Sequence, residues 1–411
     1  MDDGKAGNGP GVDLRLPESQ QAGAPVPWRA IGLLIAVLGP FALNSGFVYP
    51  ANALLLDARG FSAAVVGAVG SAGAIGYMVG SLLAPFLASA YGLRRTSVIA
   101  LLVTSGLILG FAIVPAVLLW YPMRLVHGMA TTILFVGGES ALVALAPRRM
   151  RGRVIGFYTA INSIFFASGT DVVSVLGYEG LTPYLLVASV IALLVLPIAA
   201  LGQATPRLAA TPWRQLLGSV ATIPVLLAVI GAWGWIDGAT LNLFGVYAVK
   251  RGALAPYASW LLSLLALGNV FLQFPIGWLA DHLPRQWVLA GLAATGCAGS
   301  LLLLVLDVSG TPMIITLIVF GAVGFGTFTV SLIALGDALT GTELVAANAA
   351  FGLCWGIGDF VGAASTGALM DVAGPNAFPL SLAAGFLFQW AAIVLLPFRV
   401  ASVTSHGSAG E

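Results

Sequence analysis

Four ionisable side chains interrupt long apolar stretches of this chain, and they are the residues best placed to do chemistry. They are Asp237, Asp359, Arg124 and Asp171. A carboxylate in apolar surroundings can bind and release a proton, whereas a guanidinium keeps its charge and needs a partner or water. Together they predict ion, proton or polar-solute binding, and we assign no catalytic residue.

Each of these side chains has a structural alternative, because an ion pair or a hydrogen bond between helices needs the same residue types. Trp355 precedes Asp359 by four residues and so shares its helix face, which suits a cation or a hydroxyl-rich solute. Arg124 and Asp171 are expected at comparable depth, so an ion pair between them is a hypothesis; it could anchor an anion or set the proton affinity of a carboxylate. Asn44 and Asn242 could line a polar cavity or could bridge helices.

Four further acidic residues lie closer to the ends of apolar stretches. We expect Glu139 and Asp337 to brace a gate or a loop, and Asp307 and Asp371 to be solvated.

The elements that must position these groups are membrane spans. The 411-residue chain is 59% hydrophobic and 8% charged, whereas soluble domains are about 25% charged. A spanning helix needs about 20 mostly apolar residues. Twelve such segments begin near Trp28, Ser62, Thr96, Trp120, Val154, Thr182, Gly218, Ala255, Trp287, Thr311, Val345 and Asn376. This predicts an all-α membrane protein with twelve transmembrane helices.

Several other classes of protein are disfavoured. Three histidines and two cysteines, scattered along the chain, offer no metal site, and we expect no cofactor. A net charge of +1 gives no reason to expect nucleic acid as a partner. No Gly-x-x-x-x-Gly-Lys-Ser/Thr sequence is present, so ATP-driven pumping is not supported. A membrane enzyme would need a polar catalytic cluster, which this composition does not suggest.

The distribution of basic residues predicts the orientation. With the N-terminus in the cytoplasm, thirteen of the 17 Lys and Arg residues fall on the cytoplasmic side, three on the outer side and one, Arg124, inside a span. We therefore expect both termini in the cytoplasm and residues 1–27 and 401–411 as cytoplasmic tails. The first apolar stretch is too long for a signal peptide.

An internal repeat divides the chain. A shift of 192 residues places Arg59-Gly60 on Arg251-Gly252 and the loop at 89–95 on the loop at 281–287. Parallel repeats of this kind predict two pseudo-symmetric six-helix bundles, residues 28–202 and 218–400, joined by a cytoplasmic linker at 203–217. Coincidence in a low-complexity apolar chain is the alternative.

One loop carries a family resemblance. The pattern Gly277-x-x-x-Asp281-x-x-x-Arg285, between two long apolar stretches, resembles the signature loop of major facilitator superfamily transporters. The matching first-half loop keeps Arg94 and Arg95 but has Ser89 in place of the usual acid. We expect this motif to act as a cytoplasmic gate. Asp281 could accept hydrogen bonds from the positive N-terminal end of a neighbouring helix, or pair with Arg285.

Other segments resemble the poorly characterised YcaD-like branch of that superfamily. They include Gly138-Glu139-Ser140, residues 339–343 and residues 369–375. Arg124-x-x-x-Gly128 looks like the fourth-helix motif of the family, whose arginine is linked to proton coupling. The Gly-Pro-rich motif of drug/proton antiporters is missing at 159–171, which disfavours a drug exporter.

The resemblance implies a secondary active transporter that moves a small solute by alternating access, and we expect proton coupling. Alternatives are an uncoupled uniporter and a transporter-like receptor or assembly protein that moves nothing. We expect location in a bacterial inner membrane, the lipid bilayer as surroundings, and function as a monomer.

Overall fold

The computed structural model describes residues 26–147, 150–201, 223–339 and 341–396, and within them the chain is helical. The first half contains α1 (Trp28–Ala58), α2 (Ala63–Tyr91), α3 (Leu93–Ile113), α4 (Val117–Leu145), α5 (Arg151–Leu176), α6 (Thr182–Leu193) and α7 (Val195–Ala199). The second contains α9 (Pro224–Lys250), α10 (Ala255–His282), α11 (Arg285–Leu302), α12 (Thr311–Ala338), α13 (Gly341–Ala373) and α14 (Ala377–Leu395). The expected linker at 203–217 and both tails, apart from residues 26 and 27, lie outside the described residues.

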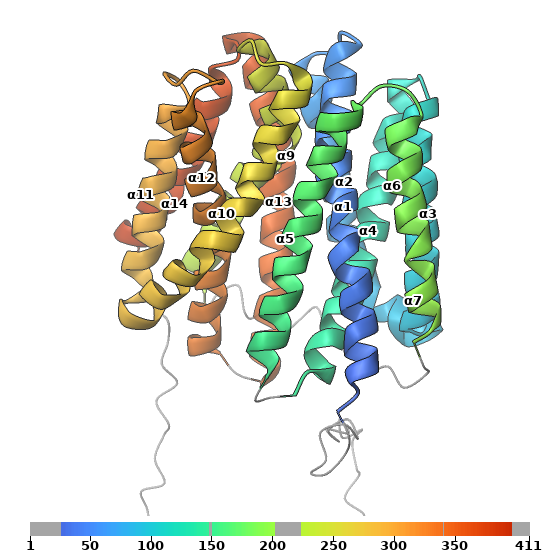
Figure 1. Ribbon diagram of the computed structural model, residues 1–411. Helices are drawn as coiled ribbons and strands as arrows, with labels where there is room; N and C mark the ends of the chain where they lie inside the picture. Colours follow the sequence, from blue (N-terminus) through green and yellow to red (C-terminus); the bar gives the residue numbers. More distant parts are fainter. Residues whose placement is uncertain (1–25, 148–149, 202–222, 340, 397–411) are drawn as a thin grey trace, which may run out of the picture.

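The helices stand side by side as one bundle (Figure 1). We call the end where α1 begins and α14 ends the terminal end, and the opposite end, where α2 and α10 begin, the far end. Ten segments of the described chain, with α6 and α7 counted as one, are long and apolar enough to cross a bilayer. Helices α11 and α13 lie beside these ten segments. With α6 and α7 counted as one, the described chain therefore forms twelve helical segments. The expected all-α fold with twelve spans is confirmed.

The two halves repeat each other. In the first half α2 packs on α4, α1 on α5 and α3 on α6; in the second α10 packs on α12, α9 on α13 and α11 on α14. Gly60 and Gly252, equivalent under the 192-residue shift, both turn the chain at the far end with a positive φ, 81° and 97°. A residue with a Cβ is strained in that conformation. The expected pair of six-helix bundles is therefore present.

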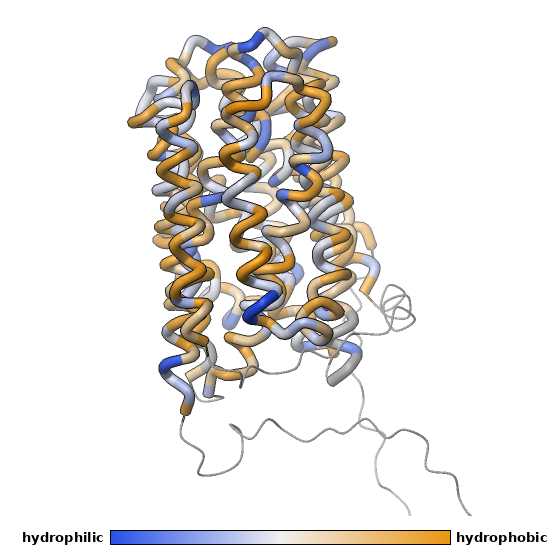
Figure 2. The backbone as a smooth tube through the Cα atoms, turned by 90° about the vertical axis from the view of Figure 1, so that its right-hand side faces the viewer, coloured by the Kyte–Doolittle hydropathy of each residue, from blue (hydrophilic) through white to orange (hydrophobic). Residues whose placement is uncertain are grey.

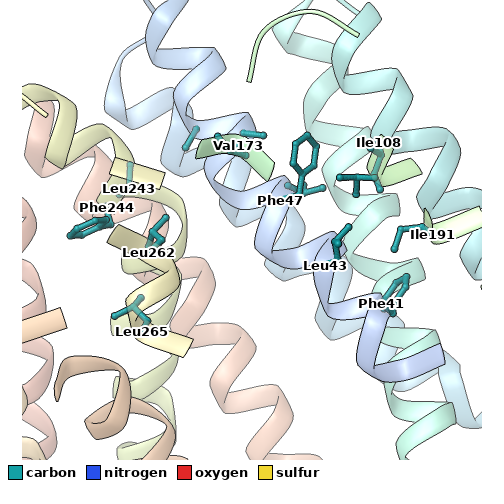
Figure 3. Packing of buried hydrophobic residues seen from close by; sticks show 14 of the residues in the cluster. Phe41, Leu43, Phe47, Ile108, Val173, Ile191, Leu243, Phe244, Leu262 and Leu265 are labelled. Carbon is teal, nitrogen blue, oxygen red and sulfur yellow. The ribbon is translucent and has the colours of Figure 1, made fainter. Parts of the chain in front are cut away.

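Apolar side chains cover most faces of these helices, as expected when both lipid and protein interior are apolar. Hydrophilic residues gather mainly at the two ends of the tube in Figure 2. Inside each half, large side chains interlock: Phe41 and Phe47 of α1 lie in the first half, and Phe244 and Leu262 in the second (Figure 3).

Close helix contacts depend on glycine. A Cβ on Gly76 or Gly80 of α2 would collide with backbone atoms of α4, and one on Gly358 or Gly362 of α13 would collide with backbone atoms of α9. Small residues allow such approach in membrane helices, where packing replaces the hydrophobic effect. Gly352, in contrast, has open space around it.

The halves meet along α2 with α13 and along α5 with α10. Hydrogen bonds between them lie at the far end or at mid-depth: Ser259 donates to the carbonyl of Thr170 at 2.8 Å, and Asn269 donates to Ser163 at 2.8 Å. Toward the terminal end, α5 and α10 diverge (Figure 1). Phe274 of α10 is 83% exposed there, whereas Leu262, nearer the far end, is buried.

Candidate functional site

Arg124 of α4 is the one Lys or Arg that lies inside a span among the described residues, and it is turned inward. Its side chain is only 3% exposed. The guanidinium lies over the ring of Tyr49 of α1, 4.8 Å from the ring centre, an arrangement that stabilises a cation. Space for it comes from Gly73 of α2, because a Cβ there would lie 3.2 Å from the guanidinium carbon.

Two carboxylates approach from the other half. Asp237 lies on α9 and Asp359 on α13, within electrostatic range of each other. Their approach is possible because Gly234 and Gly238, one turn apart on α9, face the backbone of Trp355 and of Asp359, also one turn apart on α13. Arg124 is within electrostatic range of Asp359 and offsets part of the repulsion between the two acids.

Tyr77 of α2 lies at the centre of these groups. Its ring meets Trp355 edge-on, with 4.7 Å between ring centres. The hydroxyl is within electrostatic range of Glu139, Asp237 and Asp359. Glu139 of α4 accepts a hydrogen bond from Tyr158 of α5 at 2.5 Å.

We call the following set the central cluster: Tyr49, Tyr77, Arg124, Glu139, Asp237, Trp355 and Asp359. Both halves contribute to it. Protein atoms surround Glu139, Tyr77 and Asp237 on all sides. The same side chains nevertheless keep solvent-accessible surface, and that of Glu139 is exposed. Enclosure combined with accessible surface points to an internal hollow beside Glu139, Tyr77 and Asp237.

Asn44 and Asn242 are buried and act as braces. The carboxamide oxygen of Asn44 lies 2.8 Å from Nε2 of His127, and its nitrogen donates to Thr131 of α4 at 3.4 Å. Asn242 donates to the carbonyl of Gly238 on its own helix at 2.9 Å. Of the two roles that the sequence left open, helix bridging is favoured for Asn44, whereas the hydrogen bond of Asn242 stays within α9.

The hypothesised pair of Arg124 with Asp171 does not form. Asp171 of α5 faces Ser263 of α10, at the contact between the halves. Arg124 turns instead toward Tyr49 and Asp359, because Gly73 and the small residues around it leave room on that side. Asp171 therefore lies apart from the central cluster.

The signature loop at the terminal end is only partly engaged. Arg285 forms an ion pair with Asp337 at the end of α12, with 3.3 Å between Nε and Oδ2. Asp281 is exposed and makes no ion pair with Arg285 in the described part of the chain. Gly277 has open space around its Cα, and Arg94 and Arg95 are exposed. The expected role of this loop as a gate is not visible in this arrangement.

Asp371 is exposed, as expected, and it also forms a contact between the halves. Its two carboxylate oxygens accept hydrogen bonds from the backbone N–H groups of Ala63 and Ala64, at 2.9 and 3.0 Å. Those groups have no partner within α2, because they begin the helix. The sequence did not reveal this contact, since a span boundary alone does not indicate which helix lies beside it.

Sequence reasoning missed Tyr49 and Tyr77, and it gave Glu139 a bracing role at a gate or a loop. Tyrosines are common in membrane helices, so neither tyrosine stood out in an apolar stretch. Glu139 lies near the end of its span, which suggested a loop contact, and its carboxylate accepts a hydrogen bond from Tyr158 of the neighbouring helix α5. Its signal was present in the sequence, as an acid between glycines and small residues.

The comparisons with known proteins agree with this fold. The family model of the Major Facilitator Superfamily matches residues 33–254 and 247–410. The chain belongs to this superfamily. It is therefore an integral membrane transporter and not an enzyme.

Its relatives lie in the YcaD-like branch, as the sequence predicted. The uncharacterised transporter YfkF of Bacillus subtilis is 25% identical over 358 residues, covering 82% of this chain and 87% of that protein. YcaD of Salmonella arizonae is 26% identical over 362 residues, covering 87% and 92%.

Two solved structures share the fold. The nucleoside transporter NupG aligns with a TM-score of 0.74 at 15% identity, covering 90% of this chain and all of that one. The D-xylose-proton symporter aligns with a TM-score of 0.66 at 14% identity, covering 88% and 97%.

Proposed function

We propose that this protein is a secondary active transporter that moves a small solute by alternating access, with the central cluster as the site for solute and proton. The observation that carries the proposal is the cluster itself. Its ionisable groups come from both halves and lie within the spans, beside an internal hollow. Charged residues inside a membrane protein are costly and mark pathways for ions and solutes.

The contacts between the halves support a rocking motion. Hydrogen bonds join the halves at the far end and at mid-depth, through Asp371, Ser259 and Asn269. Nearer the terminal end, the described hydrogen bonds and ion pairs stay within one half. This arrangement corresponds to a hollow closed at the far end and open at the terminal end. The opposite state requires the far-end contacts to break and the terminal end to close.

Orientation follows from the basic residues. The terminal end carries most of the Lys and Arg, so we place it in the cytoplasm, with both termini. The relatives are bacterial, which favours the inner membrane. The hollow then opens to the cytoplasm.

Proton coupling is the finer part of the proposal. Asp237 and Asp359 lie within electrostatic range of each other, and Arg124 lies within range of Asp359, so a proton held by either acid relieves their repulsion. Binding of a solute to the same acids alters which of them holds that proton. Transport and proton movement are thereby linked through shared groups.

Purified protein in sealed liposomes with a lumenal pH dye tests this function. A nucleoside, D-xylose and small amines, each radiolabelled, form the first panel, since similarly folded proteins carry the first two by name. We expect at least one solute to enter and to change the lumenal pH as it does so. Asp237→Asn should abolish the pH change.

Asp307→Asn is the matched control. Asp307 lies in the turn before α12, and hydrogen bonds from Ser309 lower its pKa, so it stays ionised and remote from the hollow. Solute entry without any pH change would favour an uncoupled uniporter. Absence of transport of any bound solute would contradict a transport function and favour a receptor.

A further inference from the structure

The accessible lining of the hollow is acidic and aromatic, while its one cation is withdrawn. Glu139, Asp237, Tyr77 and Trp355 all keep accessible surface. Arg124 is almost fully buried beneath Tyr49 and is offset by Asp359. A solute that enters therefore meets carboxylates and ring faces before it meets a positive charge.

This lining disfavours two classes of solute. An anion would face Glu139 and Asp237 with no accessible guanidinium to balance them. A sugar needs paired donors and acceptors, and side-chain amides commonly supply them. The amides of Asn44 and Asn242 are buried and already hydrogen-bonded, so they are not available to hydroxyl groups.

A cation with an apolar body is favoured by this lining. Its charge gains from a carboxylate and from the face of an aromatic ring, and both effects strengthen where water is excluded. Tyr77 and Trp355 stand edge to face, with Asp237 beside the indole and Glu139 within electrostatic range of the Tyr77 hydroxyl. Ring contacts and acid contacts are thus available to one small molecule at once.

We propose that the substrate class is small organic cations, namely protonated amines with an aromatic or apolar body, held by Asp237 and Glu139 against Tyr77 and Trp355. The inference rests on the proposed function, because it assigns the solute of the same hollow. It differs from the broader proposal in committing to the charge of that solute.

Three probes of similar shape, each with a phenyl ring, differ in charge and provide the test. Phenethylamine is a cation at neutral pH, 2-phenylethanol is neutral and phenylacetate is an anion. Isothermal titration calorimetry on the full-length protein in detergent, at neutral pH, measures binding without requiring transport. We expect phenethylamine to bind at least about tenfold more tightly than either of the others, the scale of one charged hydrogen bond. Equal or tighter binding of the alcohol or of phenylacetate, or no binding of phenethylamine, would overturn the proposal.

Variants locate the site. Asp237→Asn and Glu139→Gln should each weaken phenethylamine binding about tenfold, and Asp237→Glu, which keeps the charge, should restore part of it. Their matched controls are Asp307→Asn and Glu179→Gln, both exposed in far-end connections. Unchanged binding in Asp237→Asn and Glu139→Gln together would place the amine elsewhere and overturn the assignment.

The two proposals fail in different ways. If phenethylamine binds as expected but does not enter liposomes, the substrate class holds and the transport function fails. If a neutral or anionic solute is transported and the amine does not bind, the transport function holds and the substrate class fails.

Discussion

Asp371, near the end of α13, caps the start of α2 by accepting a hydrogen bond from the backbone N–H of Ala63 at 2.9 Å. The two helices belong to opposite halves, so a carboxylate of one half caps a helix of the other half at the far end. The positive end of the α2 dipole adds to this contact. Gly367 of α13 packs against the backbone at Ala63, which brings the carboxylate within reach.

Replacement of Asp371 by Ala should shift the protein toward a far-end-open state. Loss of a helix cap costs about 1 kcal/mol, which corresponds to roughly a fivefold change in the ratio of two states. Spin labels at Glu179 and Leu254, one in each half at the far end, would report the change as a population at longer distance. Cys297 and Cys354 must first be replaced so that only the chosen sites are labelled.

Asp307→Ala is the control, because that exposed carboxylate bonds only within its own turn. An identical distance distribution in Asp371→Ala and in the parent protein would show that the cap does not hold the far end closed.

Arg124 and Asp359 should depend on each other for stability. Arg124→Gln leaves the buried Asp359 carboxylate without its guanidinium and should destabilise the protein by about 2 kcal/mol. That is less than the loss for a direct buried ion pair, since the two groups are not within ion-pair distance. Removing both charges, in Arg124→Gln with Asp359→Asn, should recover part of the loss.

Thermal unfolding in detergent would rank the variants, with the double variant between the parent and Arg124→Gln. A double variant less stable than the sum of the two single losses would contradict this coupling.

The class and the fold could be predicted from the sequence because they depend on composition and on repetition. Long apolar stretches need no partner to be recognised as spans, and the equivalence of Gly60 and Gly252 is a local property of the chain. Asp237 and Asp359 could be singled out for the same reason, since a charge in an apolar stretch is visible without a structure.

Partners across helices could not be predicted in this way. Arg124 was expected to face Asp171, but the decisive feature is Gly73 on a third helix, which makes room on the opposite side. Arg285 pairs with Asp337, 52 positions along the chain, rather than with the nearby Asp281. Depth along a helix can be estimated from sequence, whereas the direction in which a side chain points depends on packing.

Two glycines of α13 should respond differently to alanine. Gly358→Ala would drive a methyl group into the backbone of α9 at Gly231, so the helices must separate. We expect a loss of several degrees in the unfolding temperature, since overpacking typically costs about 1–3 kcal/mol. Gly352→Ala meets open space and should be neutral or should stabilise by about 0.5–1 kcal/mol, because alanine favours a helix. Equal effects of the two substitutions would contradict the close approach of α9 and α13.

Replacement of Asn44 would distinguish a bracing role for its amide from a role in solute binding. Its side chain is fully buried between α1 and α4 and holds His127 and Thr131. Asn44→Ala removes a partner from buried polar groups, which costs about 1–3 kcal/mol, and should lower the unfolding temperature. Phenethylamine affinity in calorimetry should stay within about twofold of the parent at a temperature where the variant is folded, because the amide does not reach the hollow. Asn376→Ala, at the exposed start of α14, is the control for loss of an amide, because it removes only an exposed hydrogen bond from Arg251. A tenfold loss of affinity without a loss of stability would return Asn44 to the lining of the solute site.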